Sequence, residues 1–272
     1  MAGPKPITFL SDYGYEDEFA GVCRAVIARI APEAPVIDLT HGVPPQGVRR
    51  GAVALADALP YAPPGIHLAV VDPGVGTERR AVAARVRDAD RVLVGPDNGL
   101  LWPAMESFGG AVEAVEVSSS PFGLEPVWAT FHGRDLFAPV AARLALGAAL
   151  PEAGEPIEPR SLARLELPEA RLEDGDLVAE VLYLDRFGNA TLGARAAEFE
   201  RGPLMRGALL SVRAGGSAHD ATFATAFADV PPGELLVYED SSRRLAIAIN
   251  GGSAAEGLRV GPGDEVTLAP RR

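Results

Sequence analysis

The stretch that decides the fold is Ile66-His67-Leu68-Ala69-Val70-Val71-Asp72-Pro73-Gly74-Val75-Gly76-Thr77-Glu78-Arg79-Arg80, followed by a second apolar run at 81–86. A mostly apolar run that stops at Asp-Pro-Gly predicts a short buried strand and then a tight turn. Its Gly-x-Gly is not a dinucleotide fingerprint, because the third glycine is missing and a strand, not a helix, is predicted to follow. We therefore expect a glycine-bent loop that brings the Asp72 carboxylate and an arginine together.

Similar short runs lie on the N-terminal side of this stretch. Strands are predicted at 7–10 and 36–39, and the helical spacing of apolar residues predicts helices at 17–30 and 46–59. Short apolar strands that alternate with helices are typical of a mostly parallel sheet covered on both faces. The first half of the chain is therefore predicted to be an α/β domain.

The C-terminal part of the chain has a different pattern. Short strand-like runs lie at 177–184, 209–212, 235–238, 245–249 and 266–268. Turns that contain Gly, Pro and Asp separate them, and many short strands at this spacing predict a small β-sandwich or β-barrel.

A segment rich in Pro and Glu, at roughly 150–168, separates the two patterns. The sequence therefore predicts an N-terminal domain at 1–160 and a smaller C-terminal domain at 161–272. A chain of 272 residues is long enough for a sizeable core in such an arrangement.

Composition excludes several classes of function. The net charge is −12, from 37 acidic and 25 basic residues, so the Lys/Arg footprint of a nucleic-acid binder is absent. No stretch reaches the ~20 apolar residues of a membrane span, and the first residues lack the pattern of a signal peptide. The single cysteine, Cys23, lies in a predicted helix and is expected to be a small buried hydrophobe. We expect a cytoplasmic protein that acts on a small molecule, without a nucleic-acid or membrane partner.

Candidate chemistry gathers beyond the carboxyl ends of the predicted strands, where parallel sheets bind ligands. Asp12 follows the first strand and Asp72 the third, although each alone is equally suited to a cap or a turn. His132 lies in a third polar segment, at the start of a predicted helix. Acid–base catalysis needs a base, an orienting group and a charge stabiliser, so the predicted catalytic residues are Asp72, Arg79 and His132.

The sequence leaves the choice of arginine open and predicts no metal site. Arg80 directly follows Arg79 and is the alternative member of the pair. The other histidines, His41, His67 and His219, show no metal-ligand spacing with a cysteine or a carboxylate, so no metal site is predicted.

Six motifs follow one another along the chain. They are Phe9-Leu10-Ser11-Asp12-Tyr13-Gly14, Asp72-Pro73-Gly74-Val75-Gly76-Thr77, Gly95-Pro96-Asp97-Asn98-Gly99-Leu100, Phe131-His132-Gly133-Arg134-Asp135, Asp185-Arg186-Phe187-Gly188-Asn189 and Asn250-Gly251-Gly252-Ser253. In this order they resemble the S-adenosylmethionine hydroxide adenosyltransferases, relatives of the bacterial fluorinase and chlorinase. The resemblance runs over nearly the whole chain. It implies an N-terminal α/β domain, a C-terminal β-barrel and a homotrimer, with each site between one subunit's N-terminal domain and its neighbour's C-terminal domain.

The resemblance also implies roles around the substrate, S-adenosyl-L-methionine. Asp12 would bind the ribose hydroxyls, Asp17 and Ser241 the amino-acid end of the methionine, Asp185, Phe187 and Asn189 that end and the adenine, and the Gly251 backbone the adenine edge. Phe19 and Gln46 depart from the halogenases, which carry a hydroxyl residue and an aromatic residue at these positions.

The reaction depends on the same alignment. The halogenases have a tyrosine at the position of Asp72, within a small halide pocket. The ionisable residues Asp72, Arg79 and His132 suit water activation instead, so the resemblance implies hydrolysis to adenosine and L-methionine, without a cofactor. Two alternatives are a chlorinase-like halogenase and a non-catalytic protein that binds S-adenosylmethionine or adenosine.

Overall fold

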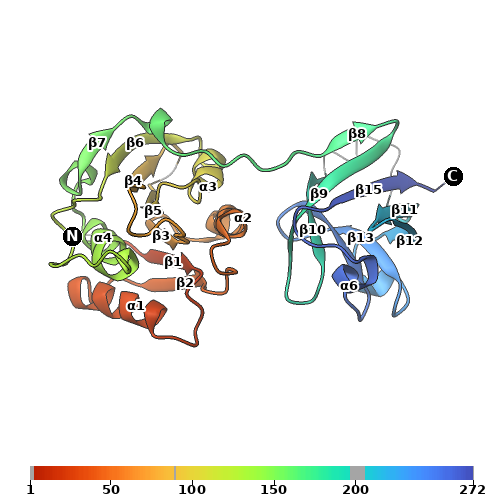
Figure 1. Ribbon diagram of the computed structural model, residues 1–272, viewed down its shortest axis with the longest axis horizontal. Coiled ribbons are helices and arrows are strands. Elements are labelled where there is room, and N and C mark those ends of the chain that lie inside the picture. Colours follow the sequence, from red (N-terminus) through yellow and green to blue (C-terminus); the bar gives the residue numbers. More distant parts are fainter. Residues whose placement is uncertain (1–2, 89, 197–205, 272) are drawn as a thin grey trace. The chain divides into compact units, whose positions relative to one another are not determined.

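The computed structural model describes residues 3–88, 90–196 and 206–271. The chain forms two compact units, Met1–Glu166 and Leu167–Arg272 (Figure 1). Each unit has its own sheet and its own hydrophobic core, so the two units fold around separate interiors.

The described part of the first unit contains one seven-stranded sheet in the order β2-β1-β3-β5-β4-β6-β7. Its strands are β1 (Ile7–Ser11), β2 (Val36–Thr40), β3 (Ile66–Val70), β4 (Ala81–Val86), β5 (Val92–Pro96), β6 (Ala111–Glu116) and β7 (Glu155–Ile157). β2, β1, β3 and β5 pair in parallel, whereas β4, β6 and β7 are joined through antiparallel pairs. β6 runs in the same direction as β5, because both are antiparallel to β4. The prediction of a mostly parallel sheet is confirmed.

Helices cover both faces of this sheet. They are α1 (Phe19–Ile30), α2 (Val48–Ala58), α3 (Trp102–Ser107), the π-helix η2 (Gly133–Phe137) and α4 (Ala138–Ala145). Phe9 belongs to the core that α1 and α4 cover, and the next residue, Leu10, belongs to the core beneath α2 and α3. Successive strand residues point to opposite faces, so one strand contributes to both cores.

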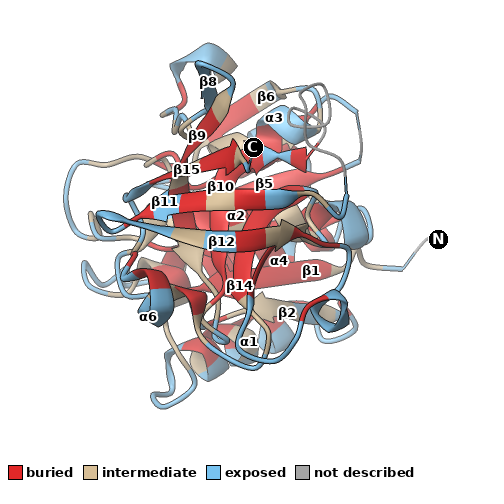
Figure 2. Ribbon diagram, turned by 90° about the vertical axis from the view of Figure 1, so that its right-hand side faces the viewer, coloured by how far each residue is buried: buried red, intermediate tan, exposed pale blue. Residues whose placement is uncertain are grey.

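The quoted stretch forms the interior strand β3, between β1 and β5, and the loop after it. All five residues of β3 are buried, as are those of its neighbour β1 (Figure 2), which is typical of parallel strands covered on both faces. The strand ends at Val70, one residue earlier than predicted. Cys23 lies on the buried face of α1, and burial raises the pKa of its thiol to about 12. It is a buried hydrophobe, as predicted.

The second unit is a closed β-barrel. Its strands are β8 (Arg171–Glu173), β9 (Asp176–Leu184), β10 (Ala190–Arg195), β11 (Leu209–Ala214), β12 (Ser217–Phe223), β13 (Leu235–Glu239), β14 (Arg244–Ile249) and β15 (Glu265–Pro270). Neighbours follow in the order β10-β14-β13-β12-β11-β15-β9, and β10 also pairs with β9, which closes a ring of seven strands. β8 pairs with β9 outside this ring. The barrel implied by the resemblance is confirmed, and a sandwich is not formed.

Part of the Pro- and Glu-rich segment belongs to the first unit. β7 pairs with β6 at the edge of the sheet, and the short 3-10 helix η4 (Pro159–Ser161) follows it. Among the described residues, no helix is both long and apolar enough to cross a membrane.

Candidate active site

Two parallel strands of the first unit deliver carboxylates to the same edge of the sheet. β1 and β3 are neighbours, in a register that pairs Ser11 with Val70. Asp12 directly follows β1, and Asp72 follows β3 after one intervening residue. Both carboxylates therefore lie beyond the carboxyl ends of adjacent strands, where parallel sheets bind their ligands.

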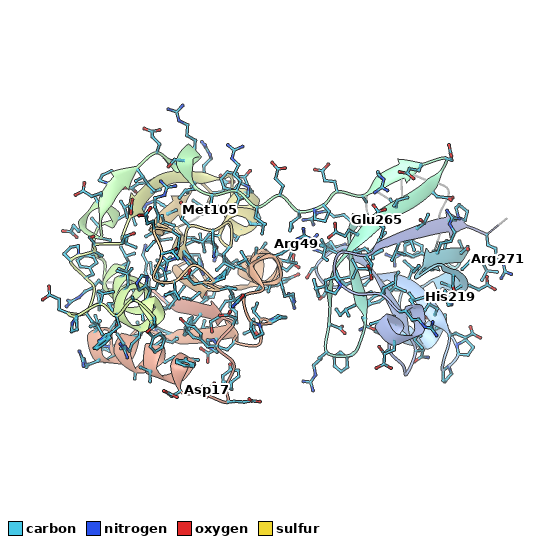
Figure 3. All side chains as sticks on the ribbon, in the orientation of Figure 1. Asp17, Arg49, Met105, His219, Glu265 and Arg271 are labelled. Atoms are coloured by element: carbon cyan, nitrogen blue, oxygen red, sulfur yellow. The ribbon has the colours of Figure 1, made fainter. Side chains whose placement is uncertain are left out.

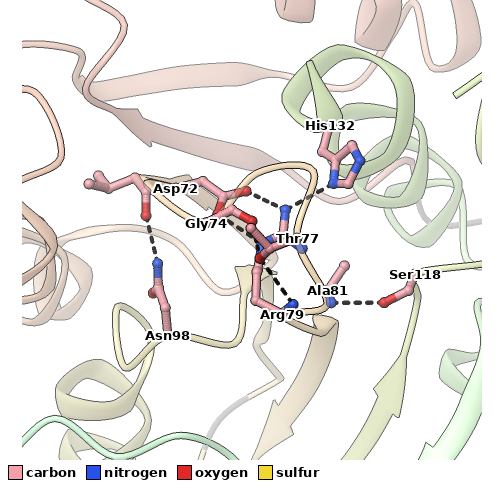
Figure 4. A network of polar contacts seen from close by, with 9 residues as sticks. Asp72, Gly74, Thr77, Arg79, Ala81, Asn98, Ser118 and His132 are labelled. Carbon is pink, nitrogen blue, oxygen red and sulfur yellow. Dashed lines mark hydrogen bonds and ion pairs between the residues drawn. The ribbon is translucent and has the colours of Figure 1, made fainter. Parts of the chain in front are cut away.

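Arg79 joins Asp72 to His132 (Figure 4). Its Nε donates a hydrogen bond to Asp72 Oδ1 at 2.8 Å, and its Nη2 donates to Asp72 Oδ2. The same Nη2 lies 2.9 Å from His132 Nδ1. The Asp72 and Arg79 side chains are only 6% and 11% exposed, so salt screens this pair less than a surface pair. The structure brings the three predicted catalytic side chains into one hydrogen-bonded group.

The contact with Arg79 assigns the protonation state of His132. A guanidinium has donors only, so His132 Nδ1 must be the acceptor. Burial lowers the pKa of His132, and the Arg79 charge lowers it further. His132 is therefore neutral near pH 7, with its proton on Nε2.

Short-range turns shape the loop between Asp72 and Arg79. The Asp72 carbonyl accepts a hydrogen bond from Val75 N at 3.2 Å, and the Gly74 carbonyl accepts one from the Thr77 hydroxyl at 2.7 Å. The same hydroxyl oxygen accepts a bond from Arg79 N at 3.3 Å. These bonds fold the loop back, so that Arg79 faces Asp72 as the glycine-bent loop predicts.

Arg80 points to a different partner. Its Nε donates to Asp97 Oδ2 at 2.9 Å, and its Nη2 donates to the same oxygen at 2.5 Å. Of the two arginines left open by the sequence, Arg79 is the one that contacts Asp72.

His132 precedes a π-helix where the sequence predicts the start of an ordinary α-helix. The π-helix η2 is followed directly by α4. A Cβ atom at Gly133 would overlap the Tyr13 hydroxyl, so a glycine permits the close approach of β1's loop to this helix. The Arg79 guanidinium lies 5.2 Å from the centre of the Phe137 ring, within cation–π range. His132, directly before the π-helix, and Phe137, at its end, thus both contact Arg79.

A cluster of three aromatic rings beside the Asp72 group was not predicted. The centre of the Tyr13 ring lies 5.9 Å from that of Phe19 and 5.8 Å from that of Phe131, and the ring centres of Phe19 and Phe131 are 5.2 Å apart. Burial raises the pKa of Tyr13 well above its ordinary value, so its hydroxyl stays protonated. Tyr13 and Phe131 each stand within a quoted motif, which is the only signal that the sequence offers for them.

Asp12 faces the backbone of Gln46, whereas Asp17 lies apart. Asp12 Oδ2 accepts a hydrogen bond from Gln46 N at 2.8 Å. Burial raises the pKa of Asp12, the bond from Gln46 N opposes this rise, and the neighbouring Asp72 carboxylate adds to it. Asp17 is exposed in the loop before α1 (Figure 3).

In the second unit, Asp185, Phe187 and Asn189 form one turn between β9 and β10. Asp185 Oδ1 accepts bonds from Phe187 N at 2.8 Å and Asn189 N at 3.0 Å, and Asp185 Oδ2 accepts one from Asn189 Nδ2 at 2.8 Å. Gly188 has a φ of 81°, a conformation that favours glycine. Because its backbone is held by Asp185, the turn presents the Phe187 ring to solvent, at 70% exposure.

A pocket of about 560 Å³ lies beside this turn. It is lined by Phe187, Asn189, Phe227, Ile249, Gly251, Gly252 and Ser253. Three predicted substrate-binding residues, Phe187, Asn189 and Gly251, therefore lie together, and the sequence did not predict their neighbour Phe227.

Asp185 and Ser241 do not line that pocket. Ser241 is exposed in the turn between β13 and β14, where Asp240 Oδ1 accepts a bond from Ser242 N at 2.8 Å. Burial, followed by the charges of Asp185 and Asp240, raises the pKa of Tyr238 to about 12. The turns of Asp185 and Ser241 are thus both close to Tyr238.

Within the described ranges, no group of three or more His, Cys, Asp or Glu side chains is arranged to hold a metal ion.

Comparisons with known proteins agree with these features. The chain matches the SAM hydroxide adenosyltransferase N-terminal domain over residues 7–154 and the C-terminal domain over residues 179–267. It is 50% identical to an (R)-S-adenosyl-L-methionine hydrolase of Salinispora tropica, over 98% of this chain and 99% of the relative. An uncharacterized conserved protein from Thermotoga maritima, solved by crystallography, superimposes with a TM-score of 0.91 at 38% identity, covering 97% of this chain and 99% of that one. A fluorinase of Nocardia brasiliensis is more distant, at 28% identity over 93% of each chain. The chain belongs to the SAM hydroxide adenosyltransferase family.

Proposed function

We propose that this protein hydrolyses (R)-S-adenosyl-L-methionine to adenosine and L-methionine by in-line attack of water on C5′. The observation that carries the proposal is the Asp72–Arg79–His132 group at the carboxyl edge of the parallel sheet. The whole-length similarity to an enzyme named for this hydrolysis supports the choice of substrate and reaction.

In this reaction the nucleophile has to be activated, whereas the leaving group does not. Sulfonium sulfur leaves as a neutral thioether, with the electrons of the C5′–S bond, and needs no proton. The enzyme has to hold a water oxygen in line with C5′ and to accept a proton as the C5′–O bond forms. Positioning of this kind lowers a barrier by ~7–11 kcal/mol in favourable cases.

Asp72 is the proposed acceptor for the water proton. Each of its carboxylate oxygens has two acceptor sites, and Arg79 uses only one on each oxygen. The remaining sites accept the O–H of water, and the proton is passed on to solvent after the C5′–O bond has formed. Arg79, which is itself bonded to neutral His132, holds the carboxylate in place. The Nε2–H of His132 donates to the attacking oxygen before the reaction begins.

The other predicted residues bind the substrate in this proposal. Asp12 uses the oxygen not bonded to Gln46 N for a ribose hydroxyl. The pocket at Phe187, Asn189 and Gly251 is large enough for an adenine, with the Phe187 ring for stacking. Asp17, Asp185 and Ser241 surround the amino-acid end of the methionine.

The assembly and the setting are part of the same proposal. By resemblance to the family, the protein is a cytoplasmic homotrimer that needs no cofactor, and each site is completed by the C-terminal unit of a neighbouring subunit. An acidic net charge of −12 suits a cationic sulfonium substrate.

Product analysis tests the proposal. The purified protein is incubated with the two sulfonium epimers of S-adenosylmethionine, with and without chloride and with and without a chelator. The nucleoside is then identified by mass spectrometry. We expect adenosine from the (R) epimer under all conditions. 5′-Chloro-5′-deoxyadenosine as the main product would establish a halogenase instead, and binding without any product would establish a sensor.

A further inference from the structure

The motif Gly95–Leu100 has no role in the mechanism above, although it lies next to the catalytic loop 71–80. It begins in the last two residues of β5, which pairs with β3 in parallel, so the residues after Pro96 reach the same edge of the sheet as Asp72. We propose that Asp97 and Asn98 are positioning residues that fix the two ends of the catalytic loop and thereby hold Arg79 against Asp72. The inference rests on the proposed function of the Asp72–Arg79–His132 group.

Asn98 holds the first end of the loop. Its Nδ2 donates to the Val71 carbonyl at 2.9 Å, directly before Asp72 (Figure 4). Its Oδ1 accepts a hydrogen bond from Leu100 N at 3.1 Å, which fixes the orientation of the amide. Val71 is fully buried, so its carbonyl would otherwise be separated from water. An alanine at position 98 would leave the start of the loop without this bond.

Asp97 holds the other end. Its N–H donates to the Arg80 carbonyl at 2.9 Å, and its Oδ2 accepts two bonds from the Arg80 guanidinium, which also donates to Ser161. The Asp97 side chain is only 6% exposed. Its second oxygen, Oδ1, accepts a bond from Ala163 N at 2.7 Å, so the carboxylate is used on both sides. One carboxylate thus ties the loop to the segment that ends the first unit.

Arg79 depends on both anchors because it lies between them. Adjacent residues in an extended chain point to opposite sides, and β4 begins at Ala81, directly after the two arginines. With Arg80 held by Asp97, Arg79 is turned toward Asp72. A shift of ~1 Å in a catalytic group can cost ~10²-fold in rate, so loosening either anchor should slow the reaction.

The test uses Asn98→Ala and Asp97→Asn, with Asp90→Asn as the matched control. Asp90 lies before the amino end of β5 and is 60% exposed in an ion pair with Lys5, far along the strand from the loop. We expect kcat for adenosine release to fall ~10–100-fold in both test variants, with KM changed less than threefold. In an Asp72→Asn background, the same changes should have almost no further effect on kcat. The control should keep both constants.

A second readout does not require activity. The NMR titration of the His132 ring reports on Arg79, whose charge helps to lower the pKa of this histidine. In both test variants the His132 midpoint should rise toward its ordinary value, and Arg80→Lys should shift it less than Arg80→Ala. If the wild type releases no adenosine, the proposed function fails, and this titration still tests the anchors.

The proposal is overturned if folded Asn98→Ala and Asp97→Asn keep a wild-type kcat or a wild-type His132 titration. A lowered thermal midpoint without a change in either readout would establish a purely structural role. If Asn98→Ala does not fold, the milder Asp97→Asn carries the test.

Discussion

Arg79 joins Asp72 and His132 through hydrogen bonds. Its guanidinium donates to the two oxygens of Asp72 and to Nδ1 of His132. The Asp72 carboxylate keeps further acceptor sites, and the proton of neutral His132 lies on Nε2. The Phe137 ring supports the guanidinium from one side. In the proposed mechanism, the attacking water meets an acceptor on Asp72 and a donor on His132, and the two together orient it.

Replacing Asp72 by Asn should separate catalysis from folding. The amide retains the shape of the carboxylate but cannot receive a proton, so kcat should fall by ~10²–10⁴-fold with little change in KM. The kcat and the thermal midpoint are measured on the same preparation. A destabilised variant with normal kcat would identify Asp72 as a turn residue only.

Asp12 should affect binding more than turnover. Its proposed contact with the ribose hydroxyls is equal in the ground state and the transition state, so Asp12→Ala should mainly raise KM. Steady-state kinetics with S-adenosylmethionine check this expectation. A collapsed kcat at unchanged KM would show that Asp12 takes part in the chemistry.

His132 should give the protein an acid limit. Its pKa is lower in the folded protein than in the unfolded chain, because burial and the Arg79 charge oppose protonation. Its contribution to stability is therefore complete above about pH 6.5 and is lost as the pH falls toward the lowered pKa. Protonated Nδ1 cannot accept from Arg79, so kcat should fall over the same range.

The measurement is the thermal midpoint and kcat between about pH 5 and 8, across the range in which histidine titrates. His132→Asn should lose the acid limb that is specific to the wild type, whereas His219→Asn, in the other unit, should retain it. Identical profiles for the wild type and His132→Asn would contradict this role.

At the scale of elements, strands with continuous apolar runs were predictable and strands with mixed faces were not. β3 is buried on both faces, so its sequence alone identifies it. β12, with the sequence Ser-Ala-His-Asp-Ala-Thr-Phe, has few apolar residues and forms through its pairs with β11 and β13. β10 is a similar case, since it closes the barrel through β9 and β14. The local pattern of apolar and polar residues does not predict which distant segments pair as strands.

The same distinction applies to the site. Asp72 and Arg79 are seven residues apart, and the turn that brings them into contact is predicted by the glycines between them. The packing of Tyr13 against Phe131 joins segments far apart in the chain. Nothing in the sequence around either residue distinguishes it from an ordinary aromatic core residue. The π-helix before α4 lies close to Tyr13 at Gly133, and no periodicity predicts this contact.

Gly133 in the π-helix is the position where this packing can be tested. A methyl group there meets the hydroxyl of Tyr13, whose ring is held by Phe9, Phe19 and Phe131. Gly133→Ala should therefore destabilise the protein by ~1–3 kcal/mol and lower kcat, because His132 is the preceding residue.

Gly21→Ala in α1 is the control, since nothing lies within 4 Å of its added Cβ. It should stabilise the helix by up to ~1 kcal/mol. Denaturant unfolding of both variants checks the pair. Equal stability of Gly133→Ala and the wild type would mean that Tyr13 moves away without cost.

For the whole molecule, the assembly can be tested by complementation. An Asp72→Asn chain has an impaired N-terminal unit, and an Asn189→Ala chain has an impaired C-terminal unit. If sites form between subunits of a trimer, mixed trimers contain some sites with two intact halves. Random mixing should then restore about a quarter of the wild-type activity.

Each variant is also measured alone, and mass from light scattering reports the number of subunits. Mixing without any gain in activity would contradict a site shared between subunits.

The burial of Cys23 has a practical consequence. A thiol with a pKa of about 12 is almost entirely protonated near neutral pH, and the thiolate is the species that reacts with maleimides and disulfides. The wild-type chain should therefore react very little with thiol-specific labels. A cysteine introduced at Tyr61 of the first unit or Leu172 of the second, both highly exposed, would be the sole reactive thiol. A fluorophore or spin label attached at either position would therefore report on the environment of its own unit alone.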